Sequence, residues 1–256
     1  MNVLCVGDVI GTVGCEFLRS HLPSLKRLKK IDAVIVNGEN SSDSNGIVPH
    51  SADHIFTSGA DCITTGNHCF QRHESYAMYD SNLPIIRPAN FPDGVPGRGM
   101  EILDFGRFRL AVINLMGLVG MFETLACPFK TADALLEQCD TKFIIVDFHA
   151  EATAEKRALA EYLDGRVSAV FGTHTHVQTA DEQILEKGTG FITDVGMTGP
   201  VSSVIGMRRD IAIERMTRHM PVRNVYADGP CMINAILFEL DNSTGKTISV
   251  ERIMLK

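Results

Sequence analysis

Short apolar runs of strand length recur along the chain and alternate with segments of helical spacing. The runs are rich in β-branched residues, and each ends at a glycine or a polar cluster: NVLCVG, DAVIVNG, DCITTGN, FRLAVINLMG, KFIIVDFH, VSAVFGTH and TGFITDVG. Four other stretches predict helices: CEFLRSHLPSLKRLKK, SADHIFTSGA, TADALLEQCD and ATAEKRALAEYLDG. Strands that alternate with helices predict a layered α/β fold.

The distribution of these runs predicts mixed sheets within one domain. Residues 84–113 and 191–256 are richer in strand and turn signals than the rest of the chain. The last two runs, CMINAILFELD and KTISVERIML, alternate apolar and polar residues around NSTG, and they predict an antiparallel hairpin. A length of 256 residues is near the upper limit for one hydrophobic core, so we expect a single domain over residues 1–256.

Composition narrows the classes of partner. The net charge is −7 and the lysines and arginines are dispersed, so we expect no extended nucleic-acid surface. Seven scattered cysteines without a C-x-x-C pair argue against a disulfide framework or a zinc knuckle, and are typical of a reducing cytoplasm. The start, MNVLCVGDVIG, lacks a basic leader, and no apolar run is long enough to cross a bilayer. We therefore expect a cytoplasmic protein without a membrane partner.

Polar side chains collect just past the carboxyl ends of five of the strand-like runs. In open α/β sheets the ligand crevice lies outside these ends, so the five loops can meet there. The residues concerned are Asp8, Glu39, Asn40, Asn67, His68, His149, His174 and His176.

The sequence GTHTH at 172–176 places two histidines two residues apart. If the backbone stays extended, His174 and His176 point the same way and reach one target, while Thr173 and Thr175 point away. Imidazoles beside carboxylates and amides form a nitrogen-and-oxygen ligand set, which suits manganese, iron or zinc better than calcium. The candidate ligands exceed the four of one tetrahedral zinc. They suit two ions that share a bridging carboxylate, for which Glu39 is the natural choice.

Each of these residues also has an ordinary structural explanation. Asp8 could cap a helix, the GN of GNH could simply form a turn, and His149 could be a core histidine. The glycine-rich GDVIGTVG could open a dinucleotide-binding turn, but its spacing is not G-x-G-x-x-G and no G-K-[ST] follows. A metal site is favoured because a single site explains the polar residues at all five strand ends.

Taken in order, Asp8, the NGEN and GNH motifs, His149 and the GTHTH motif resemble the calcineurin-like metallophosphoesterases. That superfamily usually carries D-x-H, G-D-x-x-D, G-N-H-[DE], a single histidine and G-H-x-H. The chain more closely resembles the YmdB-like group of bacterial phosphodiesterases, from residue 1 into the 220s. The motifs that carry this resemblance are GDVIG, NGEN, RPANFP, DFHAEAT, GTHTHVQTAD and TDVGMTGP.

Two positions depart from the superfamily pattern, and the YmdB-like group shares both. Ile10 stands at the histidine of D-x-H, and Glu39 replaces the bridging aspartate. The resemblance implies that the amide oxygen of Asn40 replaces the missing imidazole, although Asn40 could equally hold the turn of NGEN. It implies two ligand sets: Asp8, Glu39, Asn40 and His176 for the first metal, and Glu39, Asn67, His149 and His174 for the second.

The resemblance also implies a fold and a reaction. The fold is a four-layer α/β/β/α sandwich with two mixed sheets. The reaction is hydrolysis of small phosphodiesters, with 2′,3′-cyclic nucleotides as the substrate class, by attack of a metal-bridging hydroxide while His68 acts as general acid. Iron or manganese is the expected metal, at two ions per chain, with zinc as a further candidate. The group tends to form homo-oligomers.

Two other functions remain open on the sequence. A phosphomonoesterase or a protein phosphatase would use the same metals. A non-catalytic metal-dependent regulator or scaffold would use the ions only to tie the five loops together. Replacement of His68 separates the catalyst from the scaffold, because only a catalyst has turnover to lose.

Overall fold

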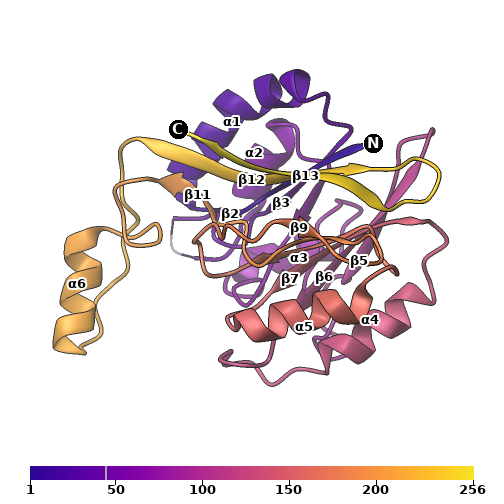
Figure 1. Cartoon of the computed structure of the whole chain (residues 1–256). Helices are drawn as coiled ribbons and strands as arrows, with labels where there is room; N and C mark the ends of the chain where they lie inside the picture. The colour runs from indigo at the N-terminus through magenta and orange to yellow at the C-terminus, as the bar shows by residue number, and fades with distance from the viewer. Residues whose placement is uncertain (44) are drawn as a thin grey trace.

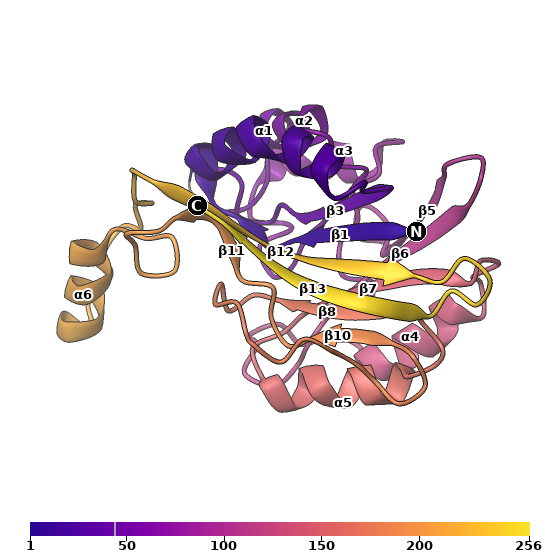
Figure 2. The ribbon, with the colours of Figure 1, turned by 45° about the horizontal axis from the view of Figure 1, so that its top comes forward.

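A computed structural model describes residues 1–43 and 45–256. Two β-sheets are stacked face to face, with helices on both outer sides (Figures 1 and 2). This arrangement confirms the expected four-layer α/β/β/α sandwich with two mixed sheets.

The first sheet contains seven strands within the described residues, and β13 pairs with β12 alongside the main path of six. Strands β1, β3 and β4 are parallel to one another, whereas β12 runs antiparallel to β1 and to β13. In spatial order the strands are β2 (Asp8–Val9), β11 (Met197–Pro200), β12 (Cys231–Leu240), β1 (Asn2–Val6), β3 (Ala33–Asn37) and β4 (Cys62–Thr64), with β13 (Thr247–Leu255) beside β12. The pairing of β12 with β13 confirms the predicted C-terminal hairpin.

The second sheet has six strands in the part of the chain that the structure describes. Strands β6, β7, β8 and β10 are parallel, and the two edge strands are antiparallel to their neighbours. The spatial order is β5 (Met100–Asp104), β6 (Arg109–Met116), β7 (Phe143–His149), β8 (Ala169–Thr173), β10 (Gly190–Ile192) and β9 (Gln183–Ile184).

Helices cover the outer face of each sheet. Figure 2 shows α1, α2 and α3 above the first sheet and α4 and α5 below the second. The helix bounds are α1 (Gly11–Leu28), α2 (Pro49–Thr57), the 3₁₀ turn η1 (His73–Ser75), α3 (Tyr76–Tyr79), α4 (Pro128–Leu136), α5 (Thr153–Leu163) and α6 (Arg209–Arg218). None of the helices in the described residues is both long and apolar enough to span a membrane.

The central strands are buried on both faces, which explains why they read as continuous apolar runs. Along β1 the side chains alternate: Leu4 and Val6 belong to the core under α1, whereas Val3 and Cys5 belong to the core between the two sheets. Side chains from both sheets fill the space between them, so the strand ends of one sheet are fixed relative to those of the other.

Helix α6 was not predicted, because residues 191–256 were expected to form strands and turns. It lies in the segment 201–230 between β11 and β12, which we call the arm, and it stands away from the sheets (Figure 1). Only Ala212 of this helix is buried, so it lacks the broad apolar stripe by which helices are recognised. The charges at its two ends suit the helix dipole: Asp210 lies in the first turn, and Arg215 and Arg218 lie in the last.

A buried ion pair joins α5 to the loop after β10. The Lys156 ammonium lies 2.7 Å from Asp194 Oδ2, and the two side chains are 1% and 0% exposed. Asp194 also accepts the backbone N–H groups of Thr175 and Gly196, at 3.1 and 2.8 Å. The pair therefore fixes the loop after β8 against the loop after β10.

Replacement of Lys156 by methionine should lower the free energy of unfolding by about 3 kcal/mol or more, because the Asp194 carboxylate would stay buried without its cation. Guanidinium denaturation measures this change. The matched control is Arg157→Met, which breaks the exposed pair with Glu161 next along the helix and should cost no more than about 1 kcal/mol. Equal losses in the two variants would contradict a structural role for the buried pair.

Candidate active site

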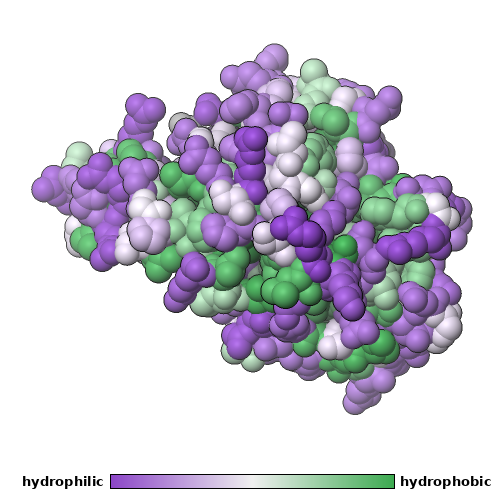
Figure 3. All heavy atoms as spheres, turned by 90° about the horizontal axis from the view of Figure 1, so that it is seen from above, coloured by the Kyte–Doolittle hydropathy of each residue, from purple (hydrophilic) through white to green (hydrophobic). Residues whose placement is uncertain are grey.

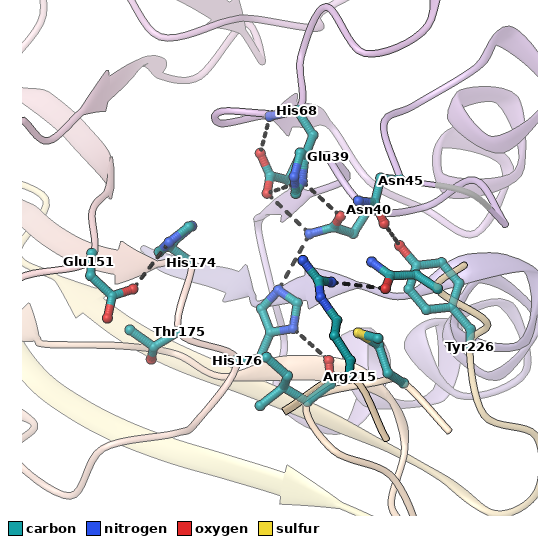
Figure 4. A pocket seen from close by; sticks show the side chains of 13 residues that line it. Glu39, Asn40, Asn45, His68, Glu151, His174, Thr175, His176, Arg215 and Tyr226 are labelled. Carbon is teal, nitrogen blue, oxygen red and sulfur yellow. Dashed lines mark hydrogen bonds and ion pairs between the residues drawn. The ribbon is translucent and has the colours of Figure 1, made fainter. Parts of the chain in front are cut away.

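All eight polar residues singled out in the sequence lie in one cluster where the two sheets meet. Those that follow β1, β3 and β4 come from the first sheet, and those that end β7 or follow β8 come from the second. The parallel strands of both sheets point their carboxyl ends to this place, as expected for an α/β fold. Figure 4 shows the members that line the open side of the cluster.

Three atoms converge on one ring nitrogen of His149. Its Nε2 lies 3.0 Å from Asn67 Oδ1, 3.0 Å from His174 Nδ1 and 3.3 Å from Glu39 Oε1. One nitrogen carries at most one proton, so it cannot donate to all three neighbours. Electron-pair donors therefore surround a common point, and ligand atoms of Glu39, His149 and His174 lie within 4.8 Å of one another.

Glu39 joins the two halves of the cluster. Its Oε1 lies 3.0 Å from Asn40 Nδ2, 3.2 Å from His68 Nδ1 and 3.3 Å from His149 Nε2. Its Oε2 accepts the backbone N–H of His68 at 3.1 Å. The side chain is 1% exposed, so this carboxylate depends on these neighbours rather than on water.

The other end of the cluster contains Asp8, Asn40 and His176. The Nε2 of His176 lies 3.6 Å from Asp8 Oδ1 and 3.3 Å from Asn40 Nδ2. Asp8 does not cap α1, which begins after Ile10, and its Oδ1 is a buried oxygen without a hydrogen-bond partner in the described residues. The Asn40 side chain points into the cluster, where its Oδ1 lies 3.0 Å from His68 Nδ1.

The prediction that both histidines of GTHTH face the same way along an extended backbone was wrong. Strand β8 ends at Thr173, and His174 and His176 have positive φ values of 102° and 64°. The backbone therefore leaves the strand geometry, and the two rings reach different ends of the cluster. Thr173 was expected to point away, but its hydroxyl oxygen lies 2.9 Å from His149 Nδ1.

Hydrogen bonds on the side of the His149 and His176 rings that faces away from the cluster fix their tautomers. Thr173 donates its own hydroxyl proton to Asp147 Oδ1 at 2.7 Å, so it accepts from His149 Nδ1. The Nδ1 of His176 donates to the carbonyl oxygen of Ile205 at 2.9 Å. Both arrangements turn Nε2 of the ring into the cluster, and hydrogen bonds of this kind orient imidazoles that bind metals.

The charges of the cluster strongly perturb its pKa values. Burial raises the pKa of Asp8, while burial of Glu39 is outweighed by His149 and His68, which hold the pKa of Glu39 well below its usual range. Burial opposes the charge on His149, but Glu39 raises the pKa of His149 to about 9. Burial, reinforced by His149, lowers the pKa of His174 to about 3. Two buried carboxylates thus lie beside His149, and Glu39 favours the charged form of that imidazole.

This donor set fits divalent metal ions. The unpartnered Asp8 oxygen and the lone pairs that meet at His149 are both satisfied by a cation. Imidazole, carboxylate and amide ligands suit manganese, iron or zinc. Gly66 keeps this space open, because a Cβ there would lie 2.3 Å from His149 Nε2 and 2.4 Å from Glu39 Oε2.

The GNH sequence forms a turn. The N–H of Cys69 bonds to the carbonyl of Gly66 at 3.1 Å, and this turn brings both Asn67 and His68 to the cluster. The His68 side chain is 26% exposed and lines a hollow that opens beside the cluster. Burial would lower the pKa of His68, but its hydrogen bond to Glu39 raises it.

The far wall of the hollow was not predicted. The hollow has a volume of about 430 Å³, and opposite the cluster it is lined by Asn45 and by residues of the arm. The arm is joined to the site by the bond from His176 to Ile205 and by Tyr226, whose hydroxyl donates to Asn45 Oδ1 at 2.8 Å. These residues follow no strand-end motif, so only the helical composition of 209–218 could have pointed to them.

Comparison with known proteins matches the whole chain. The family described as YmdB-like protein matches residues 4–253. A 2′,3′-cyclic-nucleotide 2′-phosphodiesterase of Bacillus subtilis (strain 168) is 43% identical over 257 residues, which cover 100% of this chain and 97% of the relative.

Two solved structures superpose closely on the chain. A hypothetical protein from Thermus thermophilus has a TM-score of 0.94 at 38% identity, covering 99% of this chain and 98% of that one. A novel phosphatase from Mycoplasma pneumoniae also has a TM-score of 0.94, at 33% identity, covering 100% and 93%.

The stacked mixed sheets and these relatives define a hydrolytic enzyme of the metallophosphoesterase class. Within that class, the chain belongs to the YmdB-like family. Membership of this class implies that divalent metal ions take part, and the donor set described above fits them.

In the metal-free protein the imidazole of His149 should titrate with a pKa of about 9, and Glu39→Gln should lower that pKa towards 6.5. The raised pKa means that this group stabilises the metal-free fold below about pH 6.5 and that the stabilisation is lost as the pH rises through about 9. Long-range ¹⁵N–¹H NMR of the imidazoles measures the titration. Glu151→Gln, which removes a partner of His174 only, is the control and should leave the value unchanged. A pKa that stays near 9 in Glu39→Gln would refute the assigned cause.

Proposed function

We propose that the chain is a dinuclear metal-dependent phosphodiesterase that hydrolyses small phosphodiesters, with 2′,3′-cyclic nucleotides as its substrate class. The observation that carries the proposal is the convergence of ligand atoms on both sides of the Glu39 carboxylate. The name of the Bacillus subtilis relative supports the substrate class.

The contacts of the cluster support a division into two ligand sets. Asp8, Asn40 and His176 lie at one end, and Asn67, His149 and His174 lie at the other. Glu39 contacts both groups and would be the ligand that the two ions share. Iron or manganese is the proposed metal, with zinc as a further candidate, because these ions bind mixed nitrogen and oxygen ligands.

When bound, two such ions activate water as the nucleophile and neutralise charge on the substrate phosphate. The chain contributes positioning. Thr173 and Ile205 hold the rings of His149 and His176 in the tautomers that present Nε2 inward. Asp194 fixes the Thr175 backbone between the two histidines of GTHTH. Geometry that is set before substrate arrives avoids reorganisation during the reaction.

His68 is the proposed general acid. Its ring lies at the edge of the hollow, is partly exposed and accepts or donates a proton at either nitrogen. Glu39 and Asn40 hold its Nδ1, at 3.2 and 3.0 Å, which leaves Nε2 for a proton to the leaving alkoxide.

His68→Ala should lower the turnover of 2′,3′-cyclic AMP by about 10²–10⁴-fold, because the ribose alkoxide leaves poorly without a proton. Turnover of bis-p-nitrophenyl phosphate should fall much less, because p-nitrophenolate leaves without protonation. The metal content should stay at two ions per chain, measured by elemental analysis after reconstitution with manganese. His73→Ala is the matched control, an exposed histidine that lies outside the hollow and should retain full turnover.

Several outcomes would oppose the proposal. Equal losses on both substrates would argue against the acid role of His68 and for a role in binding. Wild-type protein that hydrolyses p-nitrophenyl phosphate but neither diester would be a phosphomonoesterase. Protein that binds no metal after reconstitution would contradict the assignment of the cluster.

A further inference from the structure

The arm differs in charge from the rest of the chain. It contains five arginines and three acidic residues, a net charge of +2, whereas the remaining residues carry −9, which together give the total of −7. In the space-filling view the arm, at the left of Figure 3, is mostly hydrophilic with scattered hydrophobic residues. Positive charge beside the hollow attracts anions to it.

Two of the arm's arginines are paired and two others face hollows. Arg208 and Arg218 pair with Asp210 and Glu214, at 2.6 and 2.9 Å. Arg215 has no carboxylate partner among the described residues, and only its Nη1 is engaged, donating to Asn224 Oδ1 at 3.0 Å. Arg215 therefore keeps free donors for an anionic ligand.

Arg215 is the one lysine or arginine among the described residues that line the active-site hollow. Its side chain comes from α6 and is drawn in Figure 4 between His176 and Tyr226, among the residues that line the hollow. The hollow continues into a second one of about 350 Å³, and Asn45, Arg215 and Asn224 line both. Arg223 lines the second hollow and, within the described residues, makes no ion pair. A path thus leads from the polar cluster past Arg215 to Arg223.

We propose that Arg215 and Arg223 form a subsite for a second phosphate of the substrate, one nucleoside away from the phosphate that is cleaved. This inference rests on the proposed function, because a nucleotide held by its 2′,3′-cyclic phosphate has its other phosphate on the 5′ side. Guanidinium groups bind phosphate through paired, charge-assisted hydrogen bonds. The favoured substrate is therefore a 2′,3′-cyclic phosphate that also carries a 5′-phosphate, either free or as the link to a preceding nucleotide.

The subsite holds only one additional phosphate, which agrees with the net charge of −7 of the chain. Two arginines can hold one additional phosphate, whereas a long RNA would need a basic surface that continues over the body. The Asn45 and Asn224 side chains add neutral polar walls between the two positions. Tyr226 and Ile205 fix the arm against the site, so the spacing between the two phosphate positions is set by the fold.

A binding measurement tests the subsite independently of catalysis. Isothermal titration calorimetry of the manganese-loaded protein compares 3′-AMP with adenosine 3′,5′-bisphosphate, which differ only in the 5′-phosphate. Wild-type protein should bind the bisphosphate about tenfold more tightly or better, as expected for charge-assisted hydrogen bonds. Arg215→Gln should abolish the difference, and Arg223→Gln should reduce it. Arg218→Gln, on the same helix but paired with Glu214, is the matched control and should keep the full preference.

Kinetics then identify the source of the phosphate. The values of kcat/KM are compared for 2′,3′-cyclic AMP, its 5′-phosphorylated form and a dinucleotide that ends in a 2′,3′-cyclic phosphate. A gain with the 5′-phosphorylated mononucleotide alone assigns a free phosphate, and an equal or larger gain with the dinucleotide assigns an internucleotide phosphate. In both cases the gain should disappear in Arg215→Gln and persist in Arg218→Gln.

Two results would overturn the subsite. Equal affinity of wild-type protein for the two adenosine ligands would exclude it directly. If Arg215→Gln lost turnover of bis-p-nitrophenyl phosphate as strongly as turnover of the 5′-phosphorylated substrates, this guanidinium would instead contact the scissile phosphate. If wild-type protein prefers the bisphosphate but cleaves no diester, the subsite stands and the proposed function fails.

Discussion

The buried carboxylate of Glu39 is the group on which the rest of the site depends. It comes from the first sheet, yet it contacts His149 of the second sheet as well as His68 and Asn40. A carboxylate at 1% exposure is stable only if cations or donors surround it. The stacking of the two sheets supplies them from both sides. The same requirement explains why the cluster is suited to metal: Asp8 is a second buried carboxylate, and its Oδ1 has no hydrogen-bond partner among the described residues.

The rigid surroundings of the cluster follow from buried polar groups that lie behind it. Asp147 is fully buried, and its oxygens accept from the hydroxyls of Thr173 and Thr64 and from the amide of Asn37. Burial raises the pKa of Asp147 to about 7, so these bonds are what keep a charge there tolerable. Through Thr173 this network orients His149. The pair of Lys156 and Asp194 does the same for the loop after β8. The two sheets, their covering helices and the candidate ligands therefore form one connected structure.

Much of this arrangement could be predicted from the sequence, for a physical reason. Strands buried on both faces leave long apolar runs, and the carboxyl ends of parallel strands meet at one edge, so Asp8, Glu39, Asn67 and His149 could be placed together from order alone. The geometry of GTHTH could not. An extended backbone was the simplest extrapolation of β8, but His174 and His176 adopt positive φ because Asp194 and Ile205 hold the loop, and those contacts are long-range.

The arm shows why the wall opposite a polar cluster is harder to predict from sequence than the cluster itself. Metal ligands are constrained to a few residue types at strand ends, whereas the opposite wall needs only to bring suitable side chains to the right distance. Helix α6 does this with one buried residue and no strand-end motif. Because the helix stands away from the sheets, Arg215 is free of the close packing that surrounds the candidate ligands. Related chains could therefore keep the same cluster and change substrate preference through the arm alone, because specificity is set by contacts away from the reacting atoms.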